Sequence, residues 1–315
     1  MTGSREDARL AWQSKAVLLI VVPWTITSVL LQAQWWMAHE LSVAWQALGI
    51  SALFGLIVWR MRAATVGGAL TGAAITANLI FATAQLPYEW TWLHGGLMPL
   101  LAVFVLTYIA TKIGRAKKER LGTAESKRGR NAAQVAANLG VASLAASFPY
   151  GMFKPDPILL TSLAATTAFA SFTALAEAAA DTVSSEIGQV FGGEPRMITT
   201  FKPVAKGSDG GITLIGTLAG ALASLLVMVV GFSASQGAHF PSYWVPICLG
   251  AVGGTVGLLF DSLLGATMER RGWLNNDAVN FLSTLSAIIF ALCMIAALLV
   301  AFKLFFGAEI NFGPH

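Results

Sequence analysis

Residues 278–303 read AVNFLSTLSAIIFALCMIAALLVAFK, an apolar run that few polar side chains interrupt. A helix of about 20 apolar residues crosses the hydrocarbon core of a membrane, so this run is long enough to span one. The rest of the chain has the same character. Of its 315 residues, 56% are apolar and 11% are charged, whereas roughly 25% are charged in soluble domains. The sequence therefore predicts an integral membrane protein built from helices.

Nine apolar stretches have about the length of a membrane-spanning helix. The fifth is the least apolar, because it carries Asn131, Gln134 and Asn138, and we expect it to line a cavity. We predict an all-α fold, a polytopic transmembrane helix bundle of about nine spans. Residues 16–303 form one integral-membrane domain, and residues 1–15 form a cytoplasmic tail. The expected spans are 16–35, 41–59, 63–86, 93–111, 131–149, 158–181, 211–233, 243–264 and 278–303.

The distribution of basic residues orients this bundle. Cytoplasmic loops of membrane proteins carry an excess of Lys and Arg. With the N-terminus inside, 18 of the 20 Lys and Arg residues fall on the cytoplasmic side, and only Lys154 and Lys303 fall outside. We expect a protein of the cytoplasmic membrane with polar cytoplasmic loops at 112–130, 182–210 and 265–277. The same topology accounts for the positive net charge, so we expect no nucleic-acid partner.

The segment 181–211, DTVSSEIGQVFGGEPRMITTFKPVAKGSDGG, interrupts the apolar pattern. Glu177, Asp181 and Ser184 or Ser185 have the spacing of residues on one helix face. An acid at the centre of a span costs roughly 2.5–3.5 kcal/mol, and such residues usually face a functional cavity. The alternative is a pair of acids that are simply solvated at the membrane interface.

The end of this sixth span decides which other residues join that face. Glu186 is half a turn away from it and joins only if the helix has ended, and Gly188 is the residue expected to end the helix. Pro195 and Pro203 then favour extended chain.

The loop that follows supplies cations and glycines, which are Arg196, Lys202, Lys206, Gly207, Gly210 and Gly211. Backbone N–H groups of a glycine-rich turn at a helix N-terminus bind anions, so we expect this loop to contact phosphate. Asp209 lies in the same turn and would repel a bare phosphate. We expect it to cap the next helix or to bind a metal that the phosphates carry. The alternative is an ordinary basic loop that obeys the topology rule.

Another acid, Asp261, stands near the cytoplasmic end of the eighth span. In the loop that follows, Asn276 or Asp277 is expected to cap the ninth helix, and Asn280 comes one turn later. Residues 126–140 form a further polar segment on the same side of the membrane. Because loops on one side can meet in space, we expect the polar segments to converge on one site.

Carboxylates, amides, hydroxyls and cations suit phosphoryl transfer. Mg²⁺ prefers oxygen ligands and usually takes one or two carboxylates together with substrate phosphates, while cations neutralise phosphoryl oxygens. The chain has neither a GxxxxGK[ST] P-loop nor a GxGxxG motif, which excludes the standard nucleotide-binding folds. We expect metal ligands at Asp181, Glu186, Asp261, Asp277 and Asn280, catalytic roles for Asp181, Asp261 and Lys202, and nucleotide or phosphate binding by Arg196, Lys202, Lys206, Gly207, Gly210, Gly211 and Asn131.

Four blocks of the sequence carry a family resemblance, and they are RGRNAAQVAANLG, DTVSSEIG, PRMITTFKPVAKGSDGGITLIGT and DSLLGATMERRGWLNNDAVN. Over roughly residues 40–300 the chain resembles the integral-membrane family that includes plant phytyl phosphate kinase and many prokaryotic membrane proteins. The resemblance implies an enzyme that phosphorylates a lipid-soluble prenyl monophosphate to the diphosphate. Its co-substrate would be a nucleoside triphosphate, CTP or ATP, with Mg²⁺.

Two functions of other classes stay open. A secondary transporter places ionisable groups near the bilayer midplane on broken helices, and intramembrane carboxylates are present here. A non-catalytic membrane scaffold is the other alternative, and it leaves the acids in the spans unexplained. Most of the charged candidates stand at helix ends and in loops on one face, which favours an enzyme.

Overall fold

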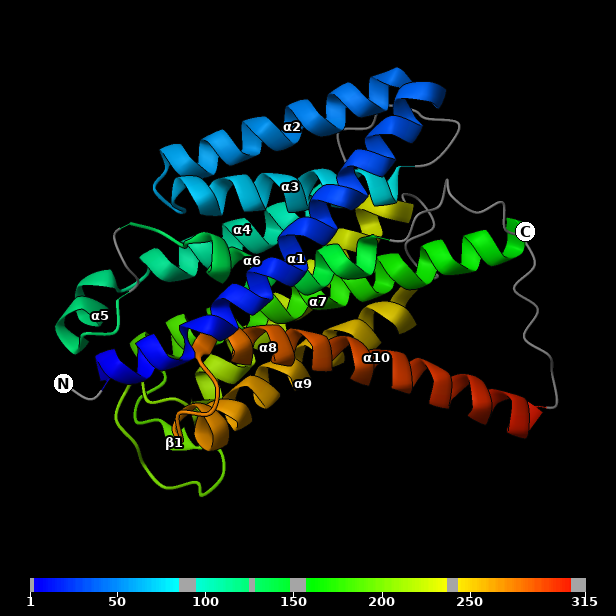
Figure 1. Ribbon diagram of the computed structural model, residues 1–315. Coiled ribbons are helices and arrows are strands. Elements are labelled where there is room, and N and C mark those ends of the chain that lie inside the picture. Colours follow the sequence, from blue (N-terminus) through cyan, green and yellow to red (C-terminus); the bar gives the residue numbers. More distant parts are fainter. Residues whose placement is uncertain (1–2, 85–94, 125–127, 148–156, 237–242, 307–315) are drawn as a thin grey trace.

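The computed structural model describes residues 3–84, 95–124, 128–147, 157–236 and 243–306, and over them the chain is mostly helical (Figure 1). Its helices are α1 (Gly3–His39), α2 (Leu41–Arg60), α3 (Val66–Thr83), α4 (Leu97–Lys112), α5 (Arg115–Leu121), α6 (Ala132–Ala146), α7 (Pro157–Phe191), α8 (Leu214–Gln236), α9 (Trp244–Leu264) and α10 (Asn276–Phe306), with a π-helical turn at Gly265–Glu269. The two-residue strands β1 (Arg196–Met197) and β2 (Gly211–Ile212) pair antiparallel.

One helix lies over each of the nine stretches predicted to span the membrane. Among the described helices, α1, α2, α3, α7, α8, α9 and α10 are long and apolar enough to cross it. Helix α4 passes the same criterion only together with α5, and the two are bent by 65°. Helix α6 is apolar but has 15 residues. The all-α polytopic bundle is confirmed, while the count of nine spans and the cytoplasmic N-terminus stay predictions.

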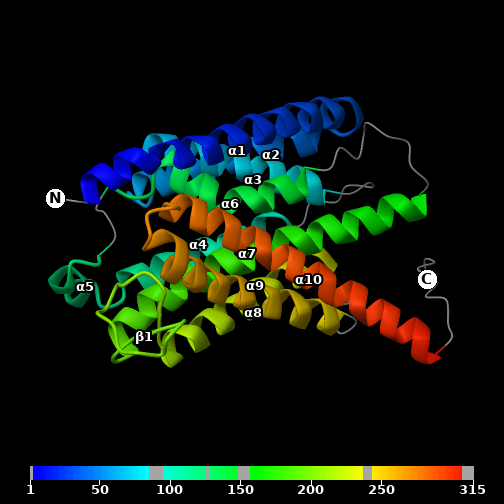
Figure 2. The ribbon, with the colours of Figure 1, turned by 60° about the horizontal axis from the view of Figure 1, so that its bottom comes forward.

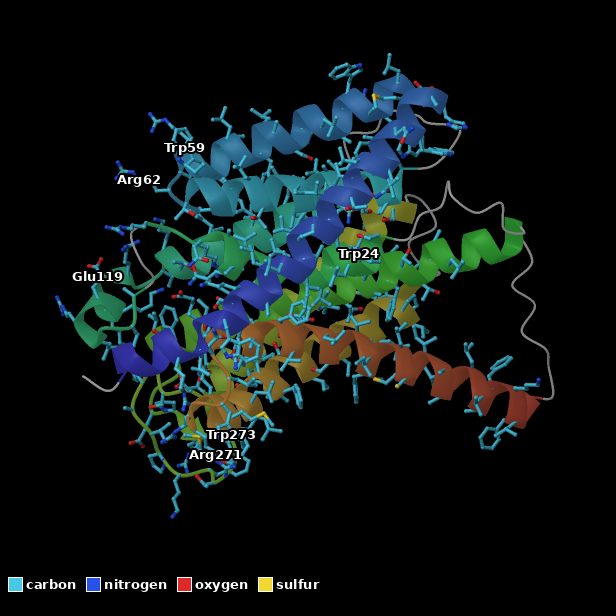
Figure 3. The ribbon with its side chains drawn as sticks, viewed as in Figure 1. Trp24, Trp59, Arg62, Glu119, Arg271 and Trp273 are labelled. Carbon is cyan, nitrogen blue, oxygen red and sulfur yellow. The ribbon has the colours of Figure 1, made fainter. Side chains whose placement is uncertain are left out.

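The charged connections of the bundle gather at one end. Figures 1 and 2 both place the start of α1, helix α5 and the β1–β2 hairpin at the same end of the long helices. Figure 3 shows Arg62, Glu119 and Arg271 there as well. We call the end that carries these three residues the charged end. Segments that were predicted to be cytoplasmic therefore lie together in the fold.

Helix α7 is central, because it packs against α4, α6, α8, α9 and α10. Its residues 174–180 are mostly alanines and are buried, and small side chains let helices in a membrane approach closely. The facing surface of helix α9 carries glycines, which also allow close packing. A Cβ atom at Gly257 would lie 2.6 Å from Cγ of Glu177. The close packing of α7 on α9 is what brings the acids of the two helices together.

The outer surface of the bundle exposes many large apolar side chains. Large side chains such as Trp24 on α1, Trp45 on α2 and Leu70 on α3 are exposed, and Figure 3 shows Trp24 away from the charged end. A soluble protein rarely exposes so many large apolar groups over contiguous helices. This surface fits the hydrocarbon of a membrane.

Several boundaries differ from the expected ones, and the predicted loop at 112–130 contains helix α5. Helix α7 continues to Phe191, so the predicted loop at 182–210 begins too early and Gly188 does not end the helix. Gly188 instead lies against α8, since a Cβ atom there would be 2.8 Å from Oγ1 of Thr213. Residues 265–269, predicted as loop, form the π-helical turn, and the predicted tail at 1–15 is helical from residue 3.

Candidate functional site

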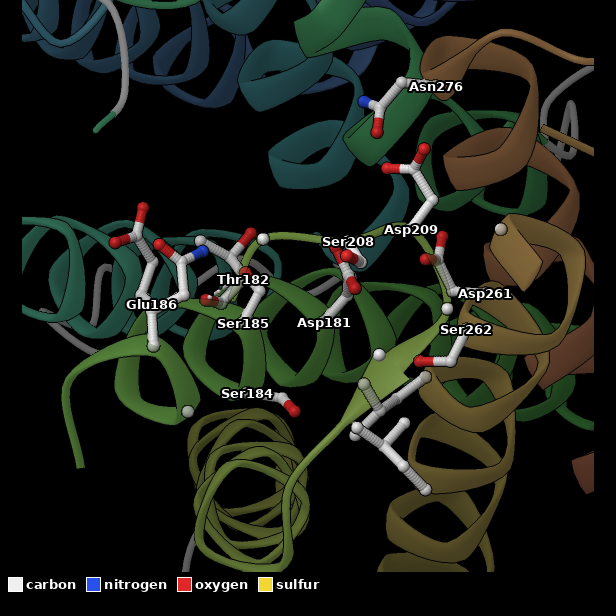
Figure 4. Close-up of a pocket in the computed structure, with 18 of the residues that line it drawn as sticks. Asp181, Thr182, Ser184, Ser185, Glu186, Ser208, Asp209, Asp261, Ser262 and Asn276 are labelled. Atoms are coloured by element: carbon white, nitrogen blue, oxygen red, sulfur yellow. Dashed lines mark hydrogen bonds between the residues drawn. The ribbon is translucent and has the colours of Figure 1, made fainter. Parts of the chain in front are cut away.

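A pocket of about 350 Å³ lies between α7, α9, α10, the start of α6 and the loop at 192–213 (Figure 4). All three of the predicted polar segments contribute to its lining. The predicted site residues that line it are Asp181, Glu186, Lys206, Gly207, Gly210, Gly211, Asp261 and Asn280, and Asn276, expected only as a helix cap, lines it too. The fold therefore brings together most of the residues that the sequence singled out.

Four predicted site residues do not line this pocket, and they are Asn131, Arg196, Lys202 and Asp277. Asn131 caps α6, where its side chain accepts the N–H of Gln134 at 3.0 Å and the Gln134 side chain accepts the N–H of Asn131 at 2.9 Å. Arg196 donates to the carbonyl of Phe201 at 2.9 Å. The side chain of Lys202 is exposed on the same hairpin.

Two helices near the pocket are capped by residues other than those expected. The Asn275 side chain accepts a backbone N–H of the first turn of α10 at 2.9 Å, so the prediction that Asn276 or Asp277 caps this helix is wrong. The hydroxyl of Thr213 accepts a backbone N–H of α8 at 3.1 Å. Asp209 therefore does not cap α8, and its carboxyl lines the pocket instead.

Two acids face the pocket from neighbouring helices, Asp181 from α7 and Asp261 from α9 (Figure 4). Their charges interact. Glu177 lies one turn deeper on α7 and is 1% exposed. Its carboxylate accepts hydrogen bonds from Ser283 at 2.8 Å and from Thr284 at 2.5 Å, both on α10. Of the two acids predicted to share a helix face, Glu177 thus joins α7 to α10, and Asp181 faces the pocket.

The chemistry of Asp181 and Asp261 fits a magnesium ion. Oδ2 of Asp261 is buried and has no hydrogen-bond partner among the described residues, whereas buried polar atoms are normally bonded. Ser262 and Asn280 add oxygen atoms to the lining. Within the described ranges, no group of three or more His, Cys, Asp and Glu side chains could hold a metal. Mg²⁺ usually takes only one or two protein carboxylates and completes its shell with water and substrate phosphates.

Arg130 and Lys206 are the cations that line the pocket in the described part of the chain. Arg130 forms a backbone bridge to Ala64, just before α3. Its Nη2 donates to the hydroxyl of Thr182 at 3.2 Å, and its charge acts on Asp181. Guanidinium and ammonium groups in such a position can neutralise phosphoryl oxygens.

Further acids line the pocket opposite α7. Asp209 belongs to the loop and Glu269 to the π-helical turn, and their charges interact. The surrounding protein displaces water from Asp209 and raises the pKa of its carboxyl, while the charge of Arg270 lowers it. The pocket gathers more carboxylates than cations, and this excess favours a bound positive ion.

Glu186 lines the pocket at the opposite end from Asp261 (Figure 4). Its carboxylate forms a buried ion pair with Lys118 of α5. The hydroxyl of Thr111 also approaches it, at 3.5 Å. Glu186 was expected to join the helix face of Asp181 only if the helix had ended before it. Because α7 continues to Phe191, this condition is not met. The ion pair with Lys118 ties α7 to α5, and the role of Glu186 as a metal ligand stays a prediction.

The loop glycines have a packing role. Gly207 and Gly210 have φ values of 80° and 76°, which other L-residues rarely adopt. A Cβ atom at Gly210 would overlap Ala266 of the π-helical turn. The N–H of Gly211 donates to the carbonyl of Ser208 at 2.9 Å. Gly210 thus lies directly against the end of α9 and closes the pocket on that side, while the predicted phosphate contacts of the loop glycines stay predictions.

The sequence interpretation left out two charged residues of the lining, Arg130 and Glu269, as functional candidates. Arg130 was counted only among the cytoplasmic positive charges, although it directly precedes the polar start of α6. Glu269 is the second acid of the block DSLLGATMERRG, after Asp261, and it was given no role. Their position in segments already linked to the site is the signal that could have found them.

Comparison with known proteins gives the family. A family model described as integral membrane protein DUF92 matches residues 49–288. The chloroplastic protein VTE6 of Arabidopsis thaliana is 30% identical over 235 residues, 73% of this chain and 68% of that protein. Protein PGR of the same plant is 31% identical over 239 residues, 72% of this chain and 79% of its own.

An uncharacterised membrane protein of Methanocaldococcus jannaschii is 44% identical over 113 residues, which are 36% of this chain and 45% of that protein. The match thus spans less than half of the archaeal protein. No solved structure matches the chain. The family model covers more than half of the chain, includes every residue that lines the pocket, and confirms the resemblance inferred from the sequence blocks. The chain therefore belongs to the integral-membrane family DUF92.

Proposed function

We propose that the protein is a membrane-embedded kinase that transfers the γ-phosphoryl group of a nucleoside triphosphate to an isoprenoid monophosphate. The observation that carries this proposal is the placement of Asp181 and Asp261 in one pocket with Arg130 and Lys206, in a helix bundle suited to a membrane. Membership of a family that includes plant phytyl phosphate kinase supports an isoprenoid acceptor.

The reaction forms one P–O bond and breaks another. An oxygen of the acceptor monophosphate attacks the γ-phosphorus, and the nucleoside diphosphate leaves with the electron pair of the broken bond. The second pKa of a phosphate monoester is about 6, so the acceptor is largely dianionic at neutral pH and needs no general base. What the protein must supply is positioning and charge neutralisation.

The residues of the pocket divide these tasks. Asp181 and Asp261 would hold Mg²⁺, which neutralises charge on the triphosphate when it is bound. Lys206 comes from the loop and would contact the phosphates of the nucleotide, CTP or ATP. Arg130 comes from the start of α6 and would contact the acceptor phosphate. Because no side chain has to accept a proton, a site without a general base is sufficient.

The test uses the purified full chain in lipid nanodiscs with Mg²⁺, CTP or ATP, and a panel of prenyl monophosphates. We expect prenyl diphosphate and nucleoside diphosphate to form in equal amounts, and only when all three components are present. The same protein in sealed vesicles tests for transport. Uptake of a substrate into nucleotide-free vesicles, with no diphosphate formed from any acceptor, contradicts the proposal.

A further inference from the structure

A second pocket of about 370 Å³ lies between α2, α3, α4 and the start of α6. Most of its lining is apolar and includes Leu100, Val103, Phe104, Val135 and Leu139. Its volume falls in the range of about 300–1,000 Å³ that small-molecule sites occupy. None of the roles considered so far uses it.

The lining of this pocket is apolar along the helices and cationic at their ends. Arg62, Lys112, Arg115 and Arg130 line it as well. Helix α4 contributes lining residues from Leu100 to Lys112, a distance of about 18 Å at 1.5 Å per residue. The cations come from helix ends and connections, and the apolar side chains come from within the helices. Such a pocket suits a ligand with an anionic head and a long apolar tail.

The second pocket adjoins the acid-lined pocket. Arg130 and Asn138 line both of them. Nδ2 of Asn138 donates to the carbonyl of Gln134 at 2.7 Å, and Nδ2 of Asn280 approaches Oδ1 of Asn138 at 3.4 Å. Asn138 of α6 therefore lies between the two pockets and contacts Asn280 of α10. A head group that reaches Arg130 from the second pocket lies beside Asp181.

We infer that the second pocket holds the isoprenoid chain of the acceptor and places its phosphate at Arg130. This inference rests on the proposed kinase function. Bilayer tails are as apolar as the pocket wall, so moving the chain from the bilayer into the pocket gains little from the hydrophobic effect. The shape of the pocket then decides which chains fit, and its main consequence is selectivity for chain length.

Gly72 on α3 allows the pocket to be shortened without a clash. A Cβ atom there would lie 3.9 Å from Cγ1 of Val135, an ordinary contact, and a longer side chain would extend into the pocket. Gly49 on α2 offers the matched control, because a Cβ atom there meets nothing within 4 Å and the residue is exposed outside both pockets. The variants Gly72→Leu and Gly49→Leu thus add the same group in different places.

Phe104→Ala enlarges the pocket, whereas Gly72→Leu shortens it. The ring of Phe104 packs on that of Phe54, with ring centroids 5.5 Å apart, and its removal widens the pocket. A general loss of folding cannot shift chain-length preference in opposite directions in two variants. The pair Gly72→Leu and Phe104→Ala therefore separates selectivity from stability.

The experiment compares kcat/KM for geranyl and geranylgeranyl monophosphate. We expect Gly72→Leu to lower the long-chain to short-chain ratio by about tenfold or more, the order of effect that one methylene group has in an apolar pocket. Phe104→Ala should raise the ratio, and Gly49→Leu should leave it unchanged. Equal ratios in Gly72→Leu and Gly49→Leu would overturn the inference.

A photoreactive diazirine analogue of geranylgeranyl monophosphate tests binding without turnover. We expect cross-links on peptides of α3 and α4, with fewer in Gly72→Leu than in Gly49→Leu. Cross-links confined to other helices, or equal competition by phosphatidylglycerol, which would mark a bilayer lipid as the occupant, would overturn the inference. If no acceptor is phosphorylated but the cross-links map to α3 and α4, the proposed kinase function fails and the chain site stands.

Discussion

Lys118 of α5 and Glu186 of α7 form a buried ion pair at the bend between α4 and α5. Lys118 is 1% exposed. Its Nζ also donates to the carbonyls of Ala110 and Thr111 in the last turn of α4, at 3.1 and 2.8 Å. One ammonium group thus satisfies the end of α4 and ties it to the helix that carries Asp181.

Removing one partner of this pair should destabilise the protein strongly. We expect Lys118→Met or Glu186→Gln alone to lower the free energy of unfolding by about 3–5 kcal/mol, because a buried group is left unpaired. The double variant Lys118→Met with Glu186→Leu should recover much of this loss. Thermal unfolding in detergent measures all three. A stable double variant that has lost Mg²⁺-dependent turnover would instead support the role of metal ligand first expected for Glu186.

The carboxylates of the pocket should be essential for turnover and dispensable for folding. We expect Asp181→Asn and Asp261→Asn each to lower kcat by about 10²-fold or more, the scale of losing one electrostatic group in an active site. The melting temperature should not fall, because an amide in a span is less costly than an acid. Glu119→Gln is the control, since its exposed ion pair with Arg115 contributes little. Full turnover in both aspartate variants would rule out this site.

The two lysines of the loop should differ in effect. We expect Lys206→Ala to weaken nucleotide use by about 10- to 150-fold, since a hydrogen bond to a charged group contributes roughly 1.5–3 kcal/mol. Lys15→Ala removes an exposed lysine of α1 and serves as control. The measurement is the KM for the nucleotide at saturating acceptor. A larger effect of Lys202→Ala than of Lys206→Ala would contradict the placement of the loop.

The docking of the loop on α9 can be separated from the backbone conformation of its glycines. Gly193 and Gly210 both have positive φ, 71° and 76°, and an L-residue there costs about 1–2 kcal/mol. A Cβ atom at Gly193 meets nothing within 4 Å, whereas one at Gly210 overlaps Ala266. We therefore expect Gly210→Ala to expose the loop to protease and reduce turnover well beyond Gly193→Ala. Equal behaviour of the two variants would mean that the loop does not need this contact.

The orientation of the bundle can be tested with introduced cysteines after Cys248 and Cys293 are replaced by serine. With the N-terminus inside, a cysteine at Glu119 or Arg271 should react in intact cells only with reagents that cross the membrane. A cysteine at Ser42, in the first turn of α2 beyond the α1–α2 connection, should react with impermeant reagents as well. The reverse pattern would invert the topology and place the pocket on the outer side.

The sequence predicts the helices well because apolar length is a local property. Each of the nine stretches contains a helix, and the polar segments meet because they share one side of the bundle. The end of α7 was predicted too early because it depends on contacts with another helix. Gly188 is a local stop signal, but packing against Thr213 keeps it within the helix.

The sequence could not predict which side chains contact one another. Lys118, Arg130 and Lys202 look alike in a count of cytoplasmic charges, yet the first is buried against Glu186, the second lines both pockets and the third is exposed. Which of several adjacent Asn and Asp residues caps a helix is equally hard to predict. Asn275, rather than Asn276, caps α10. Such choices depend on which helices become neighbours, and the order of residues does not state that.

The shortness of α6 has a consequence for kinetics under the proposed function. Its 15 residues extend about 22 Å, less than the hydrocarbon thickness of about 30 Å, so under the predicted nine-span topology at least one of its ends would lie within the bilayer. A polar helix end is tolerated there when it borders a water-filled cavity, and the start of α6 borders the acid-lined pocket. The acceptor can then meet the nucleotide without leaving its leaflet. Diluting a fixed amount of acceptor with inert lipid should slow turnover, because encounters follow its mole fraction in the membrane and not its amount per volume.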